Sequence, residues 1–262
     1  MIPAETAAEV CRRLAEIETR EAVRILLAIE SGSRAWGFAS ADSDFDVRFI
    51  YCRPESWYLS VDLEDQRDVL EYGVVDDIDL NGWDLRKSLR LLWKSNPAIV
   101  EWLQSPVEYL HRGNFRPSAL ALLPKVYSPA SGIQHYRSMA KSNYREYLRQ
   151  DTVRLKKYFY VLRPLLAVRW IEREGKAPPI EFEKLLVVLA GREDVLADIA
   201  SLLEKKKSGA EMDAAPPVQS LNAFIEAELE RLESLKSAVV GKGENVSVLN
   251  AFLRATLRET WS

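Results

Sequence analysis

The sequence has few of the residues on which disulfide-stabilised or histidine-dependent proteins rely. Its 262 residues include two cysteines and two histidines. Cys11, Cys52, His111 and His135 lie too far apart in the sequence to suggest a disulfide framework or a metal site. No apolar run approaches the roughly 20 residues that cross a bilayer, and the N-terminus lacks a secretory pattern. We therefore expect a reduced, cytoplasmic protein with no membrane partner.

The sequence also has little excess of either charge sign, because 36 Lys and Arg nearly balance 39 Asp and Glu and leave a net charge of −3. Its distribution is uneven, however. Residues 135–173 hold ten Lys or Arg against three Asp or Glu, whereas residues 42–84 are strongly acidic. An acidic segment followed by a basic one predicts a metal-binding half and a half that binds a polyanion such as RNA. The alternative interpretation is that these charges form the solvated faces of long helices.

Apolar spacing divides the chain into a mixed N-terminal part and a helical C-terminal part. The first part is expected to begin with a helix over residues 4–20 and strands over 23–29 and 43–51. At least one further strand is expected within 68–83, followed by helices over 84–95 and 98–104 and an edge strand over 107–110. Helices are expected near 116–124, 135–149, 151–174, 181–189, 193–206, 221–239 and 246–260. The predicted fold class is α+β, with a core over residues 1–112 and a helical domain over residues 113–262. Because pockets favour domain interfaces, we expect the active site between the two.

The segment from Gly32 to Asp46 carries the strongest chemical signal. Asp44 and Asp46 are two residues apart on a predicted strand, so their side chains share one face. Magnesium prefers carboxylate oxygens, and two such ions ~4 Å apart clamp the attacking and leaving oxygens in phosphoryl chemistry. Gly32 and Ser33 follow a strand, where backbone N–H groups and a hydroxyl can face phosphate. The pattern predicts a two-metal site for a nucleoside triphosphate.

Gly32-Ser33, followed by Ser43-Asp44-Phe45-Asp46, resembles the signature of DNA-polymerase-beta-type nucleotidyltransferases. The resemblance implies a mixed sheet backed by helices, often followed by a helical domain. It also implies a third carboxylate on a later strand, which binds the catalytic metal and accepts the proton of the attacking hydroxyl. Asp79 is carried over to that role, with Asp77 as the rival, since both face the same way on a strand. The resemblance assigns Asp44, Asp46 and Asp79 as catalytic metal ligands for two Mg²⁺ ions, with Mn²⁺ as the alternative.

A closer resemblance covers most of the chain. Three segments are similar to the RNA-ligase-associated polymerase-beta-like proteins (RlaP), a branch linked to RNA repair. They are residues 79–87, residues 94–103, which include Lys94-Ser95-Asn96-Pro97 and Glu101-Trp102-Leu103, and residues 156–165. This resemblance implies transfer of a nucleoside monophosphate (NMP) from an NTP to an RNA 3′ end, with release of pyrophosphate. It also implies a functional link to an RNA ligase.

The basic window contains a predicted grip for the triphosphate. Lys156, Tyr160 and Arg163 share one face of a helix over residues 151–174, and family members often supply a Lys and an aromatic hydroxyl from the helical domain. Lys157 is the competing cation. Gly32, Ser33, Arg34 and Ser43 complete the expected nucleotide-binding set. Trp36 is expected to pack under the Gly-Ser turn, with stacking on a base as the alternative.

Two rival functions remain open from the sequence. A toxin-like or small-molecule nucleotidyltransferase would share the same core but modify a tRNA or a small hydroxyl compound. A non-catalytic nucleotide- or RNA-binding module would keep the core without turnover, although the presence of all three carboxylates argues against it. Whether the basic residues of 135–173 line the cleft discriminates between RNA and a small acceptor.

Overall fold

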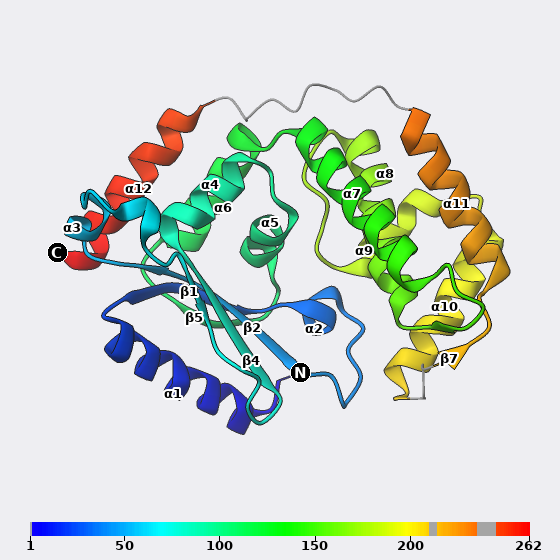
Figure 1. Cartoon of the computed structure of the whole chain (residues 1–262), viewed down its shortest axis with the longest axis horizontal. Helices are drawn as coiled ribbons and strands as arrows, with labels where there is room; N and C mark the ends of the chain where they lie inside the picture. Colours follow the sequence, from blue (N-terminus) through cyan, green and yellow to red (C-terminus); the bar gives the residue numbers. More distant parts are fainter. Residues whose placement is uncertain (1, 210–213, 235–244) are drawn as a thin grey trace.

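A five-stranded mixed sheet forms the centre of the N-terminal part in this computed structural model, which describes residues 2–209, 214–234 and 245–262. The strand order is β3-β4-β2-β1-β5. The central β2–β4 pair is parallel, and the other pairs are antiparallel. The strands are β1 (Arg24–Glu30), β2 (Phe45–Cys52), β3 (Val69–Glu71), β4 (Ile78–Asp84) and β5 (Glu108–His111) (Figure 1).

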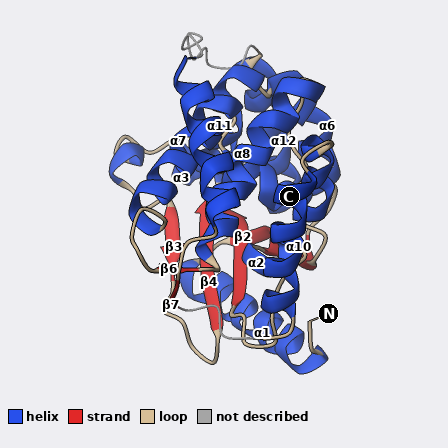
Figure 2. Cartoon of the chain, turned by 90° about the vertical axis from the view of Figure 1, so that its right-hand side faces the viewer, coloured by secondary structure: helices blue, strands red, loops and turns tan. Residues whose placement is uncertain are grey.

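The two faces of the sheet are covered by different helices. One face packs on α1 (Ala4–Glu21) through Val10, Leu14 and Ile17, at the spacing expected of a helix with one apolar stripe. The other face packs on four helices, two of which, α6 and α12, are labelled above the strands in Figure 2. These are α4 (Leu85–Trp93), α5 (Pro97–Gln104), α6 (Phe115–Val126) and α12 (Val246–Trp261). A short helix, α2 (Gly32–Trp36), follows β1 at the edge of this layer.

A second group of helices surrounds α8, whose residues 161–168 are all buried. Figure 1 shows this group beside the sheet layer. Its members are α7 (Pro129–Tyr147), α8 (Lys157–Glu174), α9 (Phe182–Leu185), α10 (Glu193–Lys207) and α11 (Gln219–Ser234). Smaller elements are α3 (Glu55–Tyr58), the 3₁₀ turns Leu63–Asp65 and Leu186–Leu189, and the short pair β6 (Val153–Arg154) and β7 (Ala214–Ala215). None of the helices within the described ranges is both long and apolar enough to cross a bilayer.

The α+β prediction is confirmed, and most elements lie where the sequence places them. Asp84 caps α4 as expected, because its carboxylate accepts a hydrogen bond from the Arg86 N–H at 2.7 Å.

Two helix starts were wrong. The helix predicted over residues 135–149 begins at Pro129, because the Ser128 hydroxyl accepts from the Ser131 N–H and caps the helix there. The helix predicted over residues 151–174 begins at Lys157, because the preceding segment pairs as β6 with β7. The end predicted at residue 239 for the helix over 221–239 lies outside the described residues.

Two helices C-terminal to residue 112 belong to the sheet layer. Helices α6 and α12 pack on α4 and the sheet, through residues such as Phe115, Leu249 and Leu257. The chain therefore returns to its first layer after passing through the helical group. A division at 112/113 remains a prediction, since these contacts bind both ends of the second part to the first.

Candidate active site

The site is built on the parallel strands β2 and β4, where Asp46 and Asp79 are directly opposite each other in the register. Side chains alternate along a strand. Val47 and Leu80 accordingly point into the core beneath α1, so Asp46 and Asp79 point to the opposite face. The fold thus brings together two carboxylates that are 33 positions apart in the chain.

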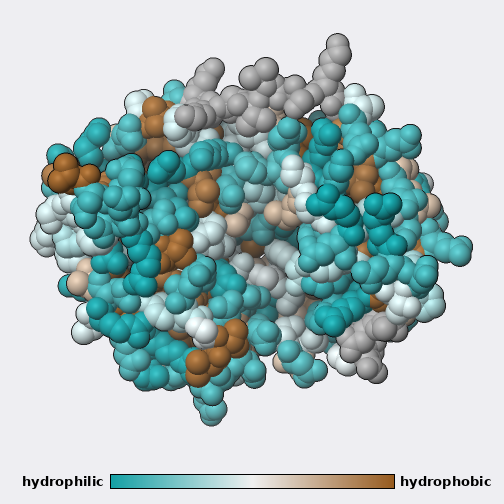
Figure 3. Space-filling model, in the orientation of Figure 1, coloured by the Kyte–Doolittle hydropathy of each residue, from teal (hydrophilic) through white to brown (hydrophobic). Residues whose placement is uncertain are grey.

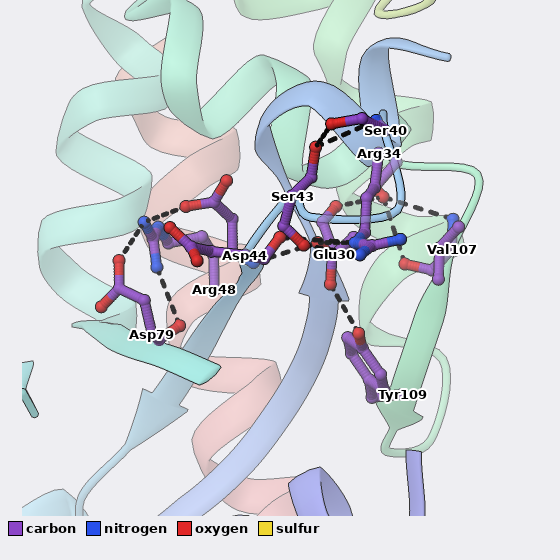
Figure 4. A network of polar contacts seen from close by, with 11 residues as sticks. Glu30, Arg34, Ser40, Ser43, Asp44, Arg48, Asp79, Val107 and Tyr109 are labelled. Carbon is purple, nitrogen blue, oxygen red and sulfur yellow. Dashed lines mark hydrogen bonds and ion pairs between the residues drawn. The ribbon is translucent and has the colours of Figure 1, made fainter. Parts of the chain in front are cut away.

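Arg48 contacts both carboxylates, and Figure 4 shows it beside Asp79. Its Nη2 is 3.1 Å from Asp46 Oδ1 and 2.7 Å from Asp79 Oδ2. Its Nη1 donates to the backbone carbonyls of Val47 at 3.0 Å and Asp79 at 3.1 Å. One guanidinium therefore faces two carboxylates. The sequence analysis missed Arg48, although its place two residues after Asp46 puts it on the same face.

Gly32 packs directly against Asp46. It has a positive φ of +57°, and a Cβ built on it would lie 2.0 Å from Asp46 Oδ2. The Ser31 N–H donates to the Asp46 carbonyl at 2.8 Å, so the turn is also tied to β2 by its backbone. The Gly-Ser turn and the carboxylate predicted to work together are therefore adjacent, and only glycine permits this approach.

We expect Gly32→Ala to displace Asp46, because the new methyl group and the carboxylate oxygen cannot occupy the same space. Gly37→Ala is a matched control, since Gly37 has a φ of +90° but nothing within 4 Å of a built Cβ. Both changes carry a backbone penalty of about 1 kcal/mol, and Gly32→Ala should lose roughly 1–3 kcal/mol more through overpacking. Urea unfolding measures both. Equal losses of unfolding free energy would show that the turn does not confine Asp46.

The buried carboxylate of Glu30, at the end of β1, is hydrogen-bonded to the backbone at the start of β2. Its Oε1 accepts from the Asp46 N–H at 3.0 Å, and its Oε2 accepts from the Tyr109 hydroxyl at 2.5 Å. Burial raises the pKa of Glu30 to about 7. The sequence analysis missed this residue too, though a charged residue at the end of an apolar strand was the available signal.

The remaining predicted carboxylates occupy different positions. Asp44 is exposed in the loop before β2. Asp77 is also exposed, in a turn with a φ of +60°, outside strand β4. Of the two rivals for the third carboxylate, Asp79 is thus the one beside Asp46. Arg34 donates to the backbone carbonyl of Ser43 at 2.6 Å and to that of Asp44 at 3.3 Å, so it orders this loop.

Electrostatics couple the three acidic residues. The pKa of Asp46 is raised, first by burial and then by the nearby charges of Asp79 and Asp44, while Arg48 lowers it. Carboxylates that repel one another in this way suit a hard divalent cation. Among the described residues, no three His, Cys, Asp or Glu are yet close enough together to hold a metal. The donor types fit Mg²⁺, provided that Arg48 moves.

A cavity of about 400 Å³ opens beside this face of the sheet, between the sheet layer and helices α7 and α8. The surface drawn in Figure 3 is hollowed between the two groups of helices. The cavity wall combines aromatic and polar side chains, among them Trp36, Trp83, Tyr160, Arg48, Asn81 and Asn143. A flat, partly polar ligand next to the Asp46–Asp79 pair would find both stacking surfaces and hydrogen-bonding groups here.

The residues of the predicted triphosphate grip lie in different environments, although Tyr160 and Arg163 both line the cavity. Lys156 is the N-cap of α8 rather than an interior residue. Tyr160 is 42% exposed and lines the cavity. Lys157 lies 4.0 Å from the centre of the Tyr147 ring and 4.8 Å from that of Tyr160, and burial lowers its pKa.

Arg163 has a different environment from the one predicted, because it is only 2% exposed. Its Nη1 donates to Glu101 Oε1 at 2.6 Å, and its Nη2 donates to the Ile180 carbonyl at 3.2 Å. Trp36 donates to the other Glu101 oxygen at 3.2 Å and lies under the Arg163 guanidinium. These contacts join α2, α5 and α8. Trp36 thus packs against α5 and α8 and also lines the cavity.

Lys206 is a cation near the site that the sequence analysis did not select. It is close to the end of α10, and its Nζ is 3.2 Å from the hydroxyl of Ser40. Ser40 in turn contacts the Ser43 hydroxyl at 3.1 Å. Burial, followed by the charge of nearby Lys156, lowers the pKa of Lys206. The run of three lysines at 205–207 was the available signal.

The basic window does not line the cavity as a whole. Among its ten basic residues, all of which the structure describes, only Arg163 contributes to the cavity wall. Lys141 pairs with Glu233 at 2.5 Å, and Arg169 pairs with Glu228 at 2.6 Å. Several of these charges therefore stabilise contacts between helices.

A family model described as "RNA repair pathway DNA polymerase beta family" (RlaP) matches residues 7–255. The chain is 43% identical over 249 residues to the "Uncharacterized protein YcgL" of Bacillus subtilis (strain 168), covering 95% of each chain. A solved nucleotidyltransferase-like protein from Exiguobacterium sibiricum 255-15 aligns with 12% identity and a TM-score of 0.34, covering 94% of this chain and 78% of that one.

Proposed function

Because the chain belongs to the RNA repair pathway DNA polymerase beta family, we propose that it transfers an NMP from an NTP to a hydroxyl acceptor and releases pyrophosphate. The observation that carries this proposal is the pairing of Asp46 with Asp79 beside Gly32, next to a cavity that their shared partner Arg48 lines. A static carboxylate pair on a solvated surface would need neither the close glycine nor the adjacent cavity. We infer an RNA 3′ end as the acceptor.

The residues on and next to strands β2 and β4 would bind the metal ions and the phosphates. Asp44, Asp46 and Asp79 would hold two Mg²⁺ ions, with Mn²⁺ as the alternative. When bound, such ions offset the charge of the triphosphate and lower the pKa of an attacking hydroxyl. Asp79 would accept the proton of that hydroxyl. Gly32 and Ser33 would bind the β- and γ-phosphates through their N–H groups and hydroxyl.

The facing helices would supply the remaining contacts to the nucleotide. Tyr160 lines the cavity, and Lys156 and Lys157 begin the same helix. Lys206 lies beside the loop that carries Ser43, so we add it to the proposed phosphate-binding cations. The ammonium groups of these lysines would offset phosphate charge from the side opposite the carboxylates.

A small hydroxyl compound is the second candidate for the acceptor. The pairing of Lys141 and Arg169 with glutamates favours it, because charges engaged in such pairs contribute less to an RNA-binding surface. The family description favours RNA. An RNA ligase that acts on the same ends is the proposed functional partner, and the base of the NTP is left to experiment.

The proposal is tested by incubating the protein with each of the four α-³²P-labelled NTPs and Mg²⁺. One set of reactions receives RNA with a free 3′ hydroxyl, and a second receives a small-molecule extract. We expect label in the RNA. Label only in small products would identify the second candidate, and no label in any reaction with the wild type would contradict nucleotidyl transfer.

A further inference from the structure

Arg48 occupies the position that a cation would need in order to bind Asp46 and Asp79 together. Its Nη2 contacts one oxygen of each carboxylate, at 3.1 and 2.7 Å, and its side chain is only 19% exposed. The second oxygen of Asp46, Oδ2, faces Gly32. An ion shared by the two carboxylates must therefore compete with the guanidinium for the oxygens that Nη2 contacts.

A guanidinium and a divalent ion cannot share this position. Magnesium binds oxygen at about 2.0–2.1 Å in near-octahedral geometry, which is closer than the Nη2 contacts and needs open space around the ion. Two cations a few ångströms apart also repel each other strongly when partly buried. Metal binding between the carboxylates thus requires that Arg48 release at least one of them.

The structure provides a second place for the guanidinium. Arg48 is directly opposite Asn81 in the β2–β4 register, and both line the cavity, as does Glu71. The Asn81 amide donates to Glu71 at 3.0 Å, which leaves its Oδ1 as the acceptor. Among the described residues, Asn81 Oδ1 is buried with no hydrogen-bond partner. A buried acceptor without a donor is costly, and the nearest strand neighbour carries five donors.

We propose that Arg48 is a counter-ion with two positions. In the metal-free protein it holds Asp46 and Asp79. When a divalent ion binds, the guanidinium turns into the cavity and donates to Asn81 Oδ1 and the Glu71 carboxylate. This inference rests on the proposed metal site at Asp46 and Asp79, and it explains why an arginine lies within a site predicted to bind metal. Arg48 is therefore a positioning residue that links metal binding to the charge of the cavity wall.

The test is Mn²⁺ affinity, measured by the electron paramagnetic resonance signal of free Mn²⁺, together with thermal unfolding with and without Mn²⁺. Arg48→Gln should bind Mn²⁺ about tenfold more tightly, since the ion no longer displaces charge-assisted hydrogen bonds. Its metal-free melting temperature should fall. Arg13→Gln is a matched control, because Arg13 is also held by two carboxylates, Glu9 and Asp76, at 2.6 and 2.7 Å. It should lower the melting temperature and leave Mn²⁺ affinity unchanged.

A double-mutant cycle isolates the second position of the guanidinium. Asn81→Leu removes the acceptor in the cavity, so it should weaken Mn²⁺ binding severalfold in the wild-type background. In the Arg48→Gln background the same change should have no effect, since there is no guanidinium to receive. If Arg48→Gln does not fold, Arg48→Lys replaces it, with a smaller gain in affinity because lysine lacks the fork of donors.

The outcomes separate this inference from the proposed function. Unchanged or weaker Mn²⁺ binding by Arg48→Gln, with binding lost in Asp46→Asn, would overturn the two-position role and leave the metal site intact. An Asn81→Leu effect of equal size in both backgrounds would also overturn it. If neither the wild type nor Arg48→Gln binds Mn²⁺, both the inference and the proposed metal dependence fail.

Discussion

Asp79→Asn is expected to reduce nucleotidyl transfer by at least about 10²–10³-fold, because an amide cannot balance the charge of a metal at the reacting centre. Asp46→Asn should have the same effect. Asp77→Asn should leave the rate within about threefold of wild type, since Asp77 is exposed in a turn and not on the Asp46 face of β4. Initial rates of label transfer at saturating NTP measure all three.

Asp77→Asn is a close control because it makes the same chemical change two residues away. Asparagine tolerates the positive φ of 60° at this position, so the turn is preserved. Thermal unfolding of each variant shows whether the fold is retained. Loss of activity in Asp77→Asn with Asp79→Asn near wild type would reverse the assignment of the third carboxylate.

The largest expected effect on stability is at Arg163. Arg163→Met should cost about 3–5 kcal/mol of unfolding free energy, because it leaves the buried Glu101 carboxylate without its charged partner. Urea unfolding measures the loss. Arg173→Met is the control, since Arg173 is 46% exposed in its pair with Glu174 and such pairs contribute at most about 1 kcal/mol.

The double variant Glu101→Gln/Arg163→Met sharpens this test. A neutral partner removes the uncompensated charge, so the double variant should regain part of the stability lost in Arg163→Met. A loss below about 1 kcal/mol in Arg163→Met would show that the pair does not hold the helical group to α5. In that case the Arg163–Glu101 pair would contribute little to stability, and the phosphate-binding role predicted for Arg163 from the sequence would be favoured.

Local sequence patterns predicted the strands that carry the site. They could not predict features that depend on contacts between distant segments. The period of two along a strand places Asp44 with Asp46, and it cannot separate Asp77 from Asp79. The structure separates them because positive φ angles at Asp76 and Asp77 form a turn before β4 begins at Ile78. The parallel register that brings Asp79 opposite Asp46 is a long-range property of the sheet.

Arg163 shows the same limit on a helix. Helical spacing predicted that it would share a face with Lys156 and Tyr160. Arg163 does line the same cavity as Tyr160, but its guanidinium is paired with Glu101, a residue 62 positions earlier in the chain, and no local pattern predicts that pairing. The start of α8 was misplaced for a related reason, because β6 is paired with β7 from a distant segment. Arg48 and Asp79 were each visible in the local sequence, but their pairing across β2 and β4 was not.

The most direct test of the proposed function compares two labels in the same reaction. Wild-type protein, Mg²⁺ and RNA with a free 3′ hydroxyl are incubated with α-³²P-NTP or with γ-³²P-NTP. We predict that the α label enters the RNA, that the γ label appears only in pyrophosphate, and that Asp46→Asn abolishes both. Transfer of the γ label to an acceptor, or α-label incorporation by Asp46→Asn at the wild-type rate, would contradict nucleotidyl transfer at the Asp46–Asp79 pair.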